Sequence, residues 1–249
     1  MNNQNKQDAI RILNQGHFKL VGNYTENALL LNACFIAAGR YQNITGTTGL
    51  STTVNIPIEL RLDNEIDVQY SNVELVKKYS ADVQGIVLKN FIIVSVSHVD
   101  ATLEDLYEHF LKIYEPLLTE PELDKRIRNA WTNDSLVNFL SEATGANLKR
   151  PVNLQTEFPE AFMRYSELRI IRHTLLHTEG KLSVKNYQKL QSNLANTPVL
   201  RQNFAILNGP IVNLNREIVL TINTILSIRQ YLDRFIGYLS QSIDERPIV

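Results

Sequence analysis

An arginine and two histidines stand close together in the stretch IRHTLLHTEGKLS, which runs from Ile171 to Ser183. Arg172, His173 and His177 fall within about one and a half helical turns. Cleavage of RNA by its own 2′-hydroxyl needs a base for that proton, an acid for the leaving oxygen and a cation against the charge on phosphorus. Histidine can serve as base and acid near neutral pH, and the guanidinium fork matches phosphate oxygens. These residue types therefore suit phosphodiester chemistry without a metal.

The three residues lie at the end of a predicted helix that runs from about Pro159 to His177 and is closed by Gly180, a common C-terminal cap. At about 100° per residue, one side of this helix is apolar and suited to a core. That side carries Leu168, Ile171 and Leu175. The other side is polar and carries Ser166, Arg169, His173 and His177, with Arg172 on its flank. We expect the polar side to face solvent or a partner.

The segment resembles the motif of the HEPN superfamily of helical bundles. That motif has an Arg, a polar residue directly after it, and a His after four to six intervening residues, usually with Gly-containing sequence just beyond. Here Arg172, His173 and His177 match, and TEGKLS follows. The sequence departs from the commonest form at His173, where the family most often has Asn. The resemblance covers roughly residues 87–242, because long helices are also predicted on both sides of the motif helix.

Active HEPN proteins are metal-independent ribonucleases that dimerise, so that two copies of the motif form one composite site. The resemblance implies that Arg172 and His177 are catalytic and that His173 orients or contacts the scissile phosphate. We expect the neighbouring cations Arg169 and Lys181 to bind substrate. The resemblance further implies a toxin or anti-phage effector whose partners are RNA, a second copy of the chain and an antitoxin or regulatory protein. No cofactor and no metal are expected.

Other interpretations of the motif stay open. A cation near a helix C-terminus interacts favourably with the helix dipole, which contributes about 0.3 to 1 kcal/mol, so Arg172 and His177 could be purely structural. His173 and His177 also have the spacing of a metal-binding pair, although Thr174 stands where the metalloprotease signature has Glu. A catalytically silent helical bundle that dimerises or binds a partner would use the same polar helix for contacts.

The bare spacing of the motif occurs a second time, in RILNQGH near the N-terminus. Arg11 and His17 satisfy it, but the residue after the arginine is the apolar Ile12. The copy at Arg172 has the polar residue, the helical setting and the glycine, and is therefore the preferred site.

Composition sets limits on the class of protein. The 249 residues carry a net charge of −1, with 44% hydrophobic and 20% charged residues, which is a globular composition. The single cysteine, Cys34, excludes a disulfide framework and a Cys-rich zinc site. The N-terminus is polar and lacks the apolar core of a signal peptide, and no apolar run reaches eighteen residues, so the sequence predicts a cytoplasmic protein without a membrane span.

The balance of charge excludes a general binder of polyanions, because such affinity comes from many Lys and Arg residues that neutralise phosphates. A basic surface must therefore be local. Residues 161–190 contain six cations against two acids, a net +4. The cations are Arg164, Arg169, Arg172, Lys181, Lys185 and Lys189, and the acids are Glu167 and Glu179.

The remaining pattern predicts further elements around the motif helix. A helix capped by Thr25 is expected to be under way by Ala28. The strongest period, in steps of three and four from near Val87 to Ile113, predicts a long amphipathic helix that stops before Pro116. One or two short helices are predicted up to Gly145, and another long helix from about residue 215 to 239.

Two segments show weak strand signals. Residues 54–70 alternate apolar and polar side chains like an edge strand, which Pro57 keeps out of a sheet interior. Asn208 and Gly209 stand between two short apolar runs and favour a hairpin. The sequence thus predicts an all-α helical bundle of long amphipathic helices with minor β structure in 52–70 and 203–214. We expect a partly helical N-terminal extension of unknown role, residues 1–83, and a HEPN-like bundle, residues 84–249.

Overall fold

The computed structural model describes residues 2–44, 50–51, 57–61, 68–196 and 211–247. Within these ranges the chain is mostly helical, and its one sheet has two short strands. The predicted all-α class with minor β structure is therefore confirmed. The chain divides into two compact units. The first joins Met1–Tyr24 to Phe91–Val249, and the second is Thr25–Asn90, so the first 24 residues pack with the motif-bearing part of the chain rather than with a separate extension.

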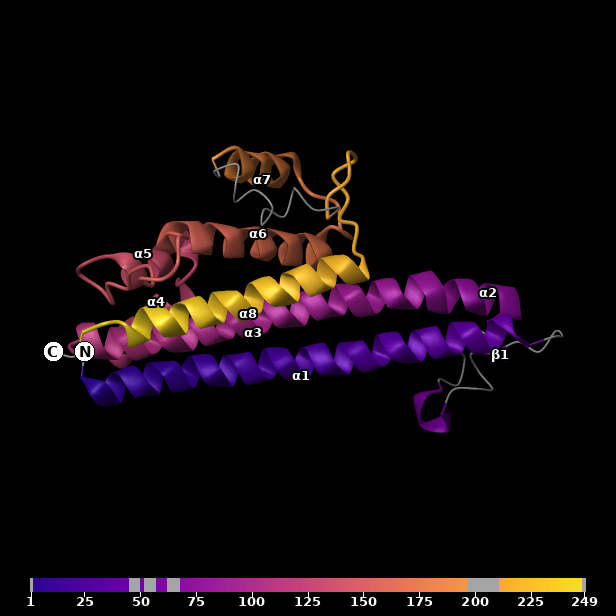
Figure 1. Ribbon diagram of the computed structural model, residues 1–249, viewed down its shortest axis with the longest axis horizontal. Helices are drawn as coiled ribbons and strands as arrows, with labels where there is room; N and C mark the ends of the chain where they lie inside the picture. The colour runs from indigo at the N-terminus through magenta and orange to yellow at the C-terminus, as the bar shows by residue number, and fades with distance from the viewer. Residues whose placement is uncertain (1, 45–49, 52–56, 62–67, 197–210, 248–249) are drawn as a thin grey trace. The chain divides into compact units, whose positions relative to one another are not determined.

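The first unit is a bundle of four helices (Figure 1). They are the first part of α1 (Asn3–Gln42), most of α3 (Val83–Tyr114), α6 (Phe158–His177) and α8 (Ile222–Asp244). Side chains bridge neighbouring helices: Tyr165 of α6 stacks on Phe235 of α8 with ring centroids 5.0 Å apart, and buried Asn23 of α1 donates to Ser95 Oγ of α3 at 2.8 Å. The candidate site is thus carried by a helix that is packed against two others.

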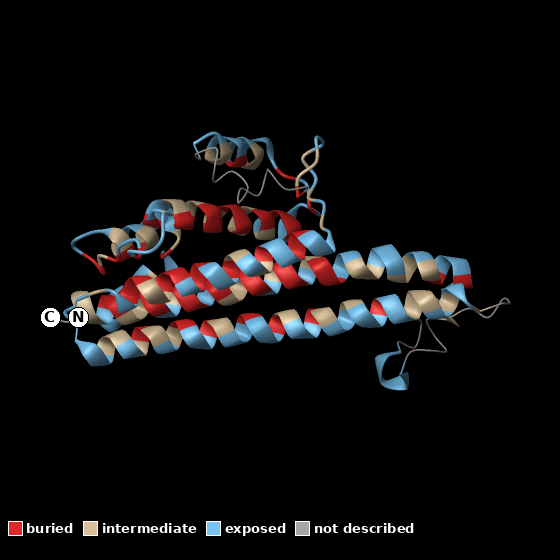
Figure 2. Ribbon diagram, viewed as in Figure 1, coloured by how far each residue is buried: buried red, intermediate tan, exposed pale blue. Residues whose placement is uncertain are grey.

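Helix α3 is buried as its sequence period predicted. Every apolar position in the stepwise series from residue 88 to 110 is buried, namely Leu88, Ile92, Val96, Val99, Leu103, Leu106 and Phe110. Figure 2 colours buried residues at intervals along the part of α3 that passes beside α8. The helix ends at Tyr114, two residues before Pro116. The predicted end is confirmed, and the cause is the steric restriction that a proline imposes on the residue before it.

The prediction that a helix starts at a Thr25 cap is wrong. Helix α1 runs without a break from Asn3 to Gln42. Its buried residues recur in steps of three, four or seven, so one narrow stripe faces the protein interior; they include Ala9, Leu13, Leu20, Asn23, Asn27 and Cys34. Two of the buried residues are asparagines, so the apolar periodicity of this segment is weak. For that reason the sequence pattern did not indicate the long helix.

Shorter helices complete the first unit. The predicted short helices before Gly145 are α4 (Glu120–Arg128) and α5 (Ser135–Ser141). Helix α7 (Val184–Ala195), which the sequence analysis did not predict, is capped by Ser183, whose hydroxyl accepts from the Asn186 backbone N–H. A 3-10 turn, η3 (Thr132–Asp134), precedes α5.

The second unit holds the rest of α1, the two strands and the start of α3. Strand β1 (Leu50–Ser51) pairs antiparallel with β2 (Gln69–Tyr70), with Leu50 opposite Tyr70. Helix α2 (Asn72–Lys77) leads through the π-helical turn η2 (Lys78–Asp82) into α3. The predicted edge strand over 54–70 is wrong at its proline, where Ile58–Leu60 form the 3-10 turn η1. Residues 52–56 and 62–67 of that prediction lie outside the described residues.

The second predicted β segment is only partly described, because residues 203–210, including Asn208 and Gly209, lie outside the described ranges. Beyond them, Val212 bridges Ile218 around a turn at Asn213–Arg216. Because of this pairing, the last long helix begins later in the sequence than predicted. The predicted start near residue 215 is wrong, and α8 begins at Ile222 after the Thr221 cap, because residues 217–219 make backbone hydrogen bonds to other segments.

The helical stretch Asn72–Tyr114 is long and apolar enough to cross a membrane by length and composition alone. Within its most apolar window, however, 56% of the residues are buried inside the protein. The core helix of a soluble protein passes the same test, and the side-chain contacts of α3 with α1 and α6 are of that kind.

Candidate functional site

Helix α6 ends where the motif ends. Its last residue is His177, and Glu179 and Gly180 then adopt positive φ angles of 52° and 89°, which favours glycine at the second position. The Thr178 hydroxyl donates to the Lys181 carbonyl at 2.6 Å. The backbone of Lys181 in turn forms an isolated antiparallel β-bridge with Glu217, in the segment before α8. The helix end is therefore held by a defined turn and by pairing to a distant part of the chain.

His173 and His177 lie side by side on the exposed surface of α6. Both residues are exposed, and their ring centroids are 4.6 Å apart with the rings tilted by 49°. The sequence analysis placed them together on the polar side of the helix, and this prediction is confirmed. The two imidazoles are accessible from solvent, as groups that exchange protons with a substrate must be.

Arg172 points differently. Its guanidinium Nη1 lies 3.5 Å from Asp100 Oδ2 of α3, and its side chain is 31% exposed. Its Nε is buried and has no hydrogen-bond partner among the described residues. Arg172 therefore turns toward the bundle and makes one long contact there, with hydrogen-bonding capacity left over.

Arg169 is held more firmly by the same carboxylate. Its Nε lies 2.9 Å from Asp100 Oδ1, and its guanidinium carbon stacks 3.7 Å from the centre of the Trp131 ring. The Trp131 indole N–H donates to Glu104 Oε1 at 2.7 Å, which fixes the ring from its other edge. Arg169 was predicted to bind substrate, and in this structure its guanidinium is engaged by both a carboxylate and an aromatic face.

The centre of this cluster is Asp100, which is buried. Besides the two arginines it accepts a 2.8 Å hydrogen bond from the Tyr165 hydroxyl. Burial raises the pKa of the Asp100 carboxyl, against the lowering effects of Arg169, the Tyr165 hydrogen bond and Arg172. Burial likewise raises the pKa of Tyr165 far above its ordinary value, and the Asp100 charge adds to this. Tyr165 therefore acts as a neutral donor that orients the carboxylate.

The local excess of positive charge is smaller than the sequence suggested. Arg164 and Glu167 form an ion pair of 2.6 Å with side chains only 5% and 2% exposed, and Asp100, which lies outside the segment, faces two of the other cations. What remains on the surface is three exposed lysines, Lys181, Lys185 and Lys189, and one exposed acid, Glu179. Lys185 and Lys189 are four residues apart on α7 and so lie on one face of it. The basic surface is thus a short row of lysines.

The sequence analysis missed Asp100, Glu104 and Trp131 as neighbours of the motif. Asp100 carried a signal that could have been used: it lies four residues after Val96 and next to Val99, on the apolar side of α3. A carboxylate on a buried face requires a cation or a strong donor. The identity of that cation could not be obtained from the pattern.

The N-terminal copy of the spacing does not form a comparable cluster. Arg11 pairs with Asp8 at 2.9 Å, and His17 pairs with Asp233 of α8 at 3.2 Å. The two residues are six positions apart on one helix and point to different sides of it. In the described ranges no group of three or more His, Cys, Asp or Glu side chains could hold a metal ion, so His173 and His177 have no third ligand there.

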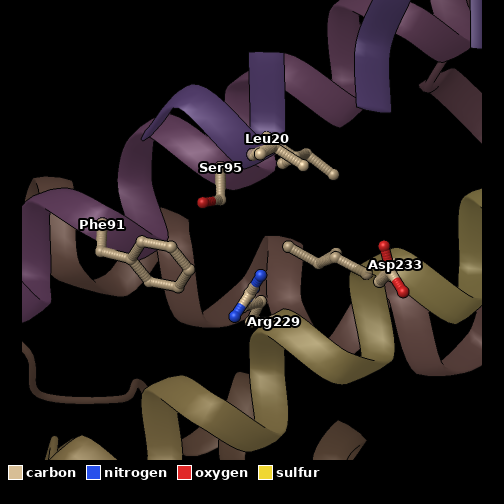
Figure 3. A pocket seen from close by; sticks show the side chains of 7 residues that line it. Leu20, Phe91, Ser95, Arg229 and Asp233 are labelled. Carbon is tan, nitrogen blue, oxygen red and sulfur yellow. The ribbon is translucent and has the colours of Figure 1, made fainter. Parts of the chain in front are cut away.

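Two hollows of the first unit are lined by described residues, one small and one open. One of about 20 Å³ lies between α1, α3 and α8 and is lined by Leu20, Phe91, Ser95, Arg229 and Asp233 among others (Figure 3). This is room for about one water molecule. Arg229 there stacks 3.6 Å from the Tyr24 ring. A second hollow, of about 280 Å³, is lined by Tyr107, α4 and Ser135. Neither includes a residue of the motif.

Comparison with known proteins identifies no relative. No protein-family model matches the chain, and no curated protein and no solved structure matches it significantly. The function must therefore be inferred from the residues and their geometry.

Proposed function

We propose that this protein is a metal-independent endoribonuclease of HEPN type that works as a cytoplasmic homodimer, in the manner of a toxin or anti-phage effector. The observation that carries the proposal is the exposed pair His173 and His177, 4.6 Å apart at the C-terminal end of α6 and directly after an arginine with unused hydrogen-bonding capacity. The resemblance of this segment to the HEPN motif points to the same chemistry.

A second copy of the chain completes the site in this proposal. Arg172 and His177 are five residues apart and so project about 140° from one another around α6. Arg172 turns toward Asp100, whereas His177 is exposed. One chain therefore does not direct both side chains at the same phosphate. If the ends of two α6 helices meet, the arginine of each copy can approach the histidines of the other.

The residues divide the reaction as follows. One His177 takes the proton from the RNA 2′-hydroxyl, and the His177 of the partner copy donates a proton to the leaving 5′-oxygen. Arg172 stabilises the charge that develops on the phosphate oxygens. His173 orients the scissile phosphate. No metal is required, because base, acid and cation are all side chains.

The lysine row supports RNA as the substrate. Lys181 lies four residues after His177, and Lys185 and Lys189 belong to α7, which packs against α6. Exposed lysines at this spacing can follow a phosphate backbone as it leaves the histidine pair. In this proposal Lys181 contacts the substrate, and an antitoxin or regulatory protein would have to cover the same surface.

One observation favours the alternative, a catalytically silent bundle of HEPN type that serves as a dimerisation or partner-binding module. Arg169 and Arg172 both face a buried carboxylate, as structural arginines do, and His177 stands where a cation stabilises a helix C-terminus. In that case the polar side of α6 would make contacts only.

The test is cleavage of mixed cellular RNA by purified protein in excess EDTA. The wild type is compared with Arg172→Ala and His177→Ala, and with Lys149→Ala as a matched control, because Lys149 is an exposed cation that belongs to neither α6 nor α7. Circular dichroism checks the fold of each variant. Cleavage by the wild type and the control alone supports the proposal. Intact RNA in all four samples, with a panel of structured and unstructured RNAs, favours the silent module.

A further inference from the structure

We propose that Asp100 is an internal counter-ion for Arg172, which occupies the arginine in the free protein and must be displaced by an RNA phosphate. The inference rests on the proposed function, since it assumes that Arg172 binds RNA. It adds a regulating element to the site that the motif alone does not contain.

The carboxylate divides its partners unevenly between its two oxygens. Oδ1 receives the Tyr165 hydroxyl at 2.8 Å and faces Arg169 Nε at 2.9 Å. Oδ2 faces Arg172 at 3.5 Å. When Arg172 leaves, Asp100 keeps its two shorter contacts and does not become an isolated buried charge. Release of Arg172 therefore costs little.

The two arginines are unequally bound as well, although their side chains are almost equally exposed, 30% for Arg169 and 31% for Arg172. Arg169 has the short ion pair and the Trp131 ring against its guanidinium. Arg172 has a single contact at 3.5 Å. The Nε atoms of both arginines lack a hydrogen-bond partner in the described part of the chain, so the two differ in ion-pair distance and in the Trp131 ring against Arg169. Of the two, Arg172 is the one free to change partners.

A phosphate is the better partner for such an arginine. A guanidinium can donate two parallel hydrogen bonds to two oxygens of a phosphate at about 2.7 to 2.9 Å, whereas Asp100 takes one contact at 3.5 Å. The carboxylate also repels an anion that has not yet displaced it. Asp100 thus lowers the affinity for weakly bound anions and reserves Arg172 for a phosphate that is already held by other groups.

The experiment is a double-mutant cycle on RNA affinity, with Asp100→Asn, Arg172→Gln and the combined variant. The probe is a fluorescein-labelled single-stranded RNA with 2′-O-methyl groups, which cannot be cleaved, and binding is followed by anisotropy. Asn keeps an oxygen for the Tyr165 hydroxyl but removes the charge. We expect Asp100→Asn to bind about three- to five-fold tighter, the size of a partly exposed ion pair, and the gain to vanish when Arg172→Gln is also present. An equal gain in the Arg172→Gln background, or no gain, overturns the proposal.

A second measurement holds even if Asp100→Asn folds poorly. Arg172→Gln and Arg169→Gln are compared by urea denaturation, and the proposal requires that the loss of stability be clearly smaller for Arg172→Gln. Equal losses would mean that both arginines are fixed and would overturn it. The cleavage assay in EDTA separates the two hypotheses. RNA cleavage without an affinity gain in Asp100→Asn would support the ribonuclease function and contradict the counter-ion role. An affinity gain without cleavage would support the counter-ion role and contradict the ribonuclease function. No RNA binding by any variant overturns both.

Discussion

Gly16 of α1 lies against Thr102 of α3, where a Cβ atom on the glycine would overlap the threonine side chain. Thr102 cannot easily turn away, because its hydroxyl donates to the His98 carbonyl at 2.7 Å. The two helices approach closely at this point because position 16 has no side chain.

Gly16→Ala is expected to destabilise the protein by about 1 to 3 kcal/mol, the usual cost of overpacking a closed contact. Gly22→Ala is the matched control on the same helix. A Cβ there meets nothing within 4 Å, so this change should stabilise α1 by about 0.5 to 1 kcal/mol. Urea denaturation followed by circular dichroism measures both. Equal effects of the two changes would contradict the close approach of the helices.

The buried ion pair between Arg164 and Glu167 should be sensitive to the loss of its cation. Arg164→Met removes the cation of an ion pair whose carboxylate is only 2% exposed, and breaking a buried pair by removing one partner typically costs about 3 to 5 kcal/mol. The control is Lys112→Ala, which breaks the exposed pair with Glu108 and should cost at most about 0.5 kcal/mol. Thermal denaturation measures the loss of stability in both variants. A small effect of Arg164→Met would argue against burial of the ion pair.

The pH dependence of stability should carry a contribution from Asp100. Burial raises the pKa of this carboxyl in the folded protein, so between the unfolded and folded pKa values the folded state binds more protons than the unfolded chain. The free energy of unfolding therefore falls as pH rises through that window. Relative to Asp100→Asn, the wild type should lose stability from about pH 4 upward and then level off. Denaturation curves at stepped pH test this, and a relative gain with rising pH would reverse the assignment.

The thiol of Cys34 should react slowly. It is 4% exposed, and burial raises its pKa, so both access and the thiolate fraction are low. Reaction with a chromogenic disulfide reagent should be slow in the native protein and fast in urea. Asn32→Cys in a Cys34→Ala background is the control, because position 32 is exposed on the same helix. Equal native rates for the two thiols would contradict the buried position of Cys34.

Salt dependence should reveal the lysine row. If Lys185 and Lys189 contact RNA phosphates, replacing each with Gln should lower the slope of log affinity against log salt by about 0.7. Lys149→Gln, an exposed lysine elsewhere in the first unit, should leave the slope unchanged. Anisotropy titrations with an uncleavable RNA at several salt concentrations provide the measurement. A uniform effect of all three replacements would indicate only general attraction.

Local signals account for the helices that were predicted correctly. The period of α3, Pro116 beyond its end, and Gly180 after α6 act through the dihedral angles of neighbouring residues and through the apolar face of a single helix. Such features are present in the sequence alone. Where the local signal is weak, as in α1, the predicted start of the helix was wrong. The buried stripe of α1 includes Asn23 and Asn27, and a buried asparagine is stable only beside a hydrogen-bond partner, as Asn23 is beside Ser95.

For the candidate site, the sequence alone determined that His173 and His177 share the polar side of a helix ending near Gly180, because helical geometry sets the positions of residues four apart. Only the tertiary structure decided what the arginines do. Asp100 stands 69 residues before Arg169 and 72 before Arg172, and it meets them because α3 and α6 pack in one register. A buried carboxylate must find a cation, but which cation it finds depends on the packing of the two helices, which no local pattern encodes.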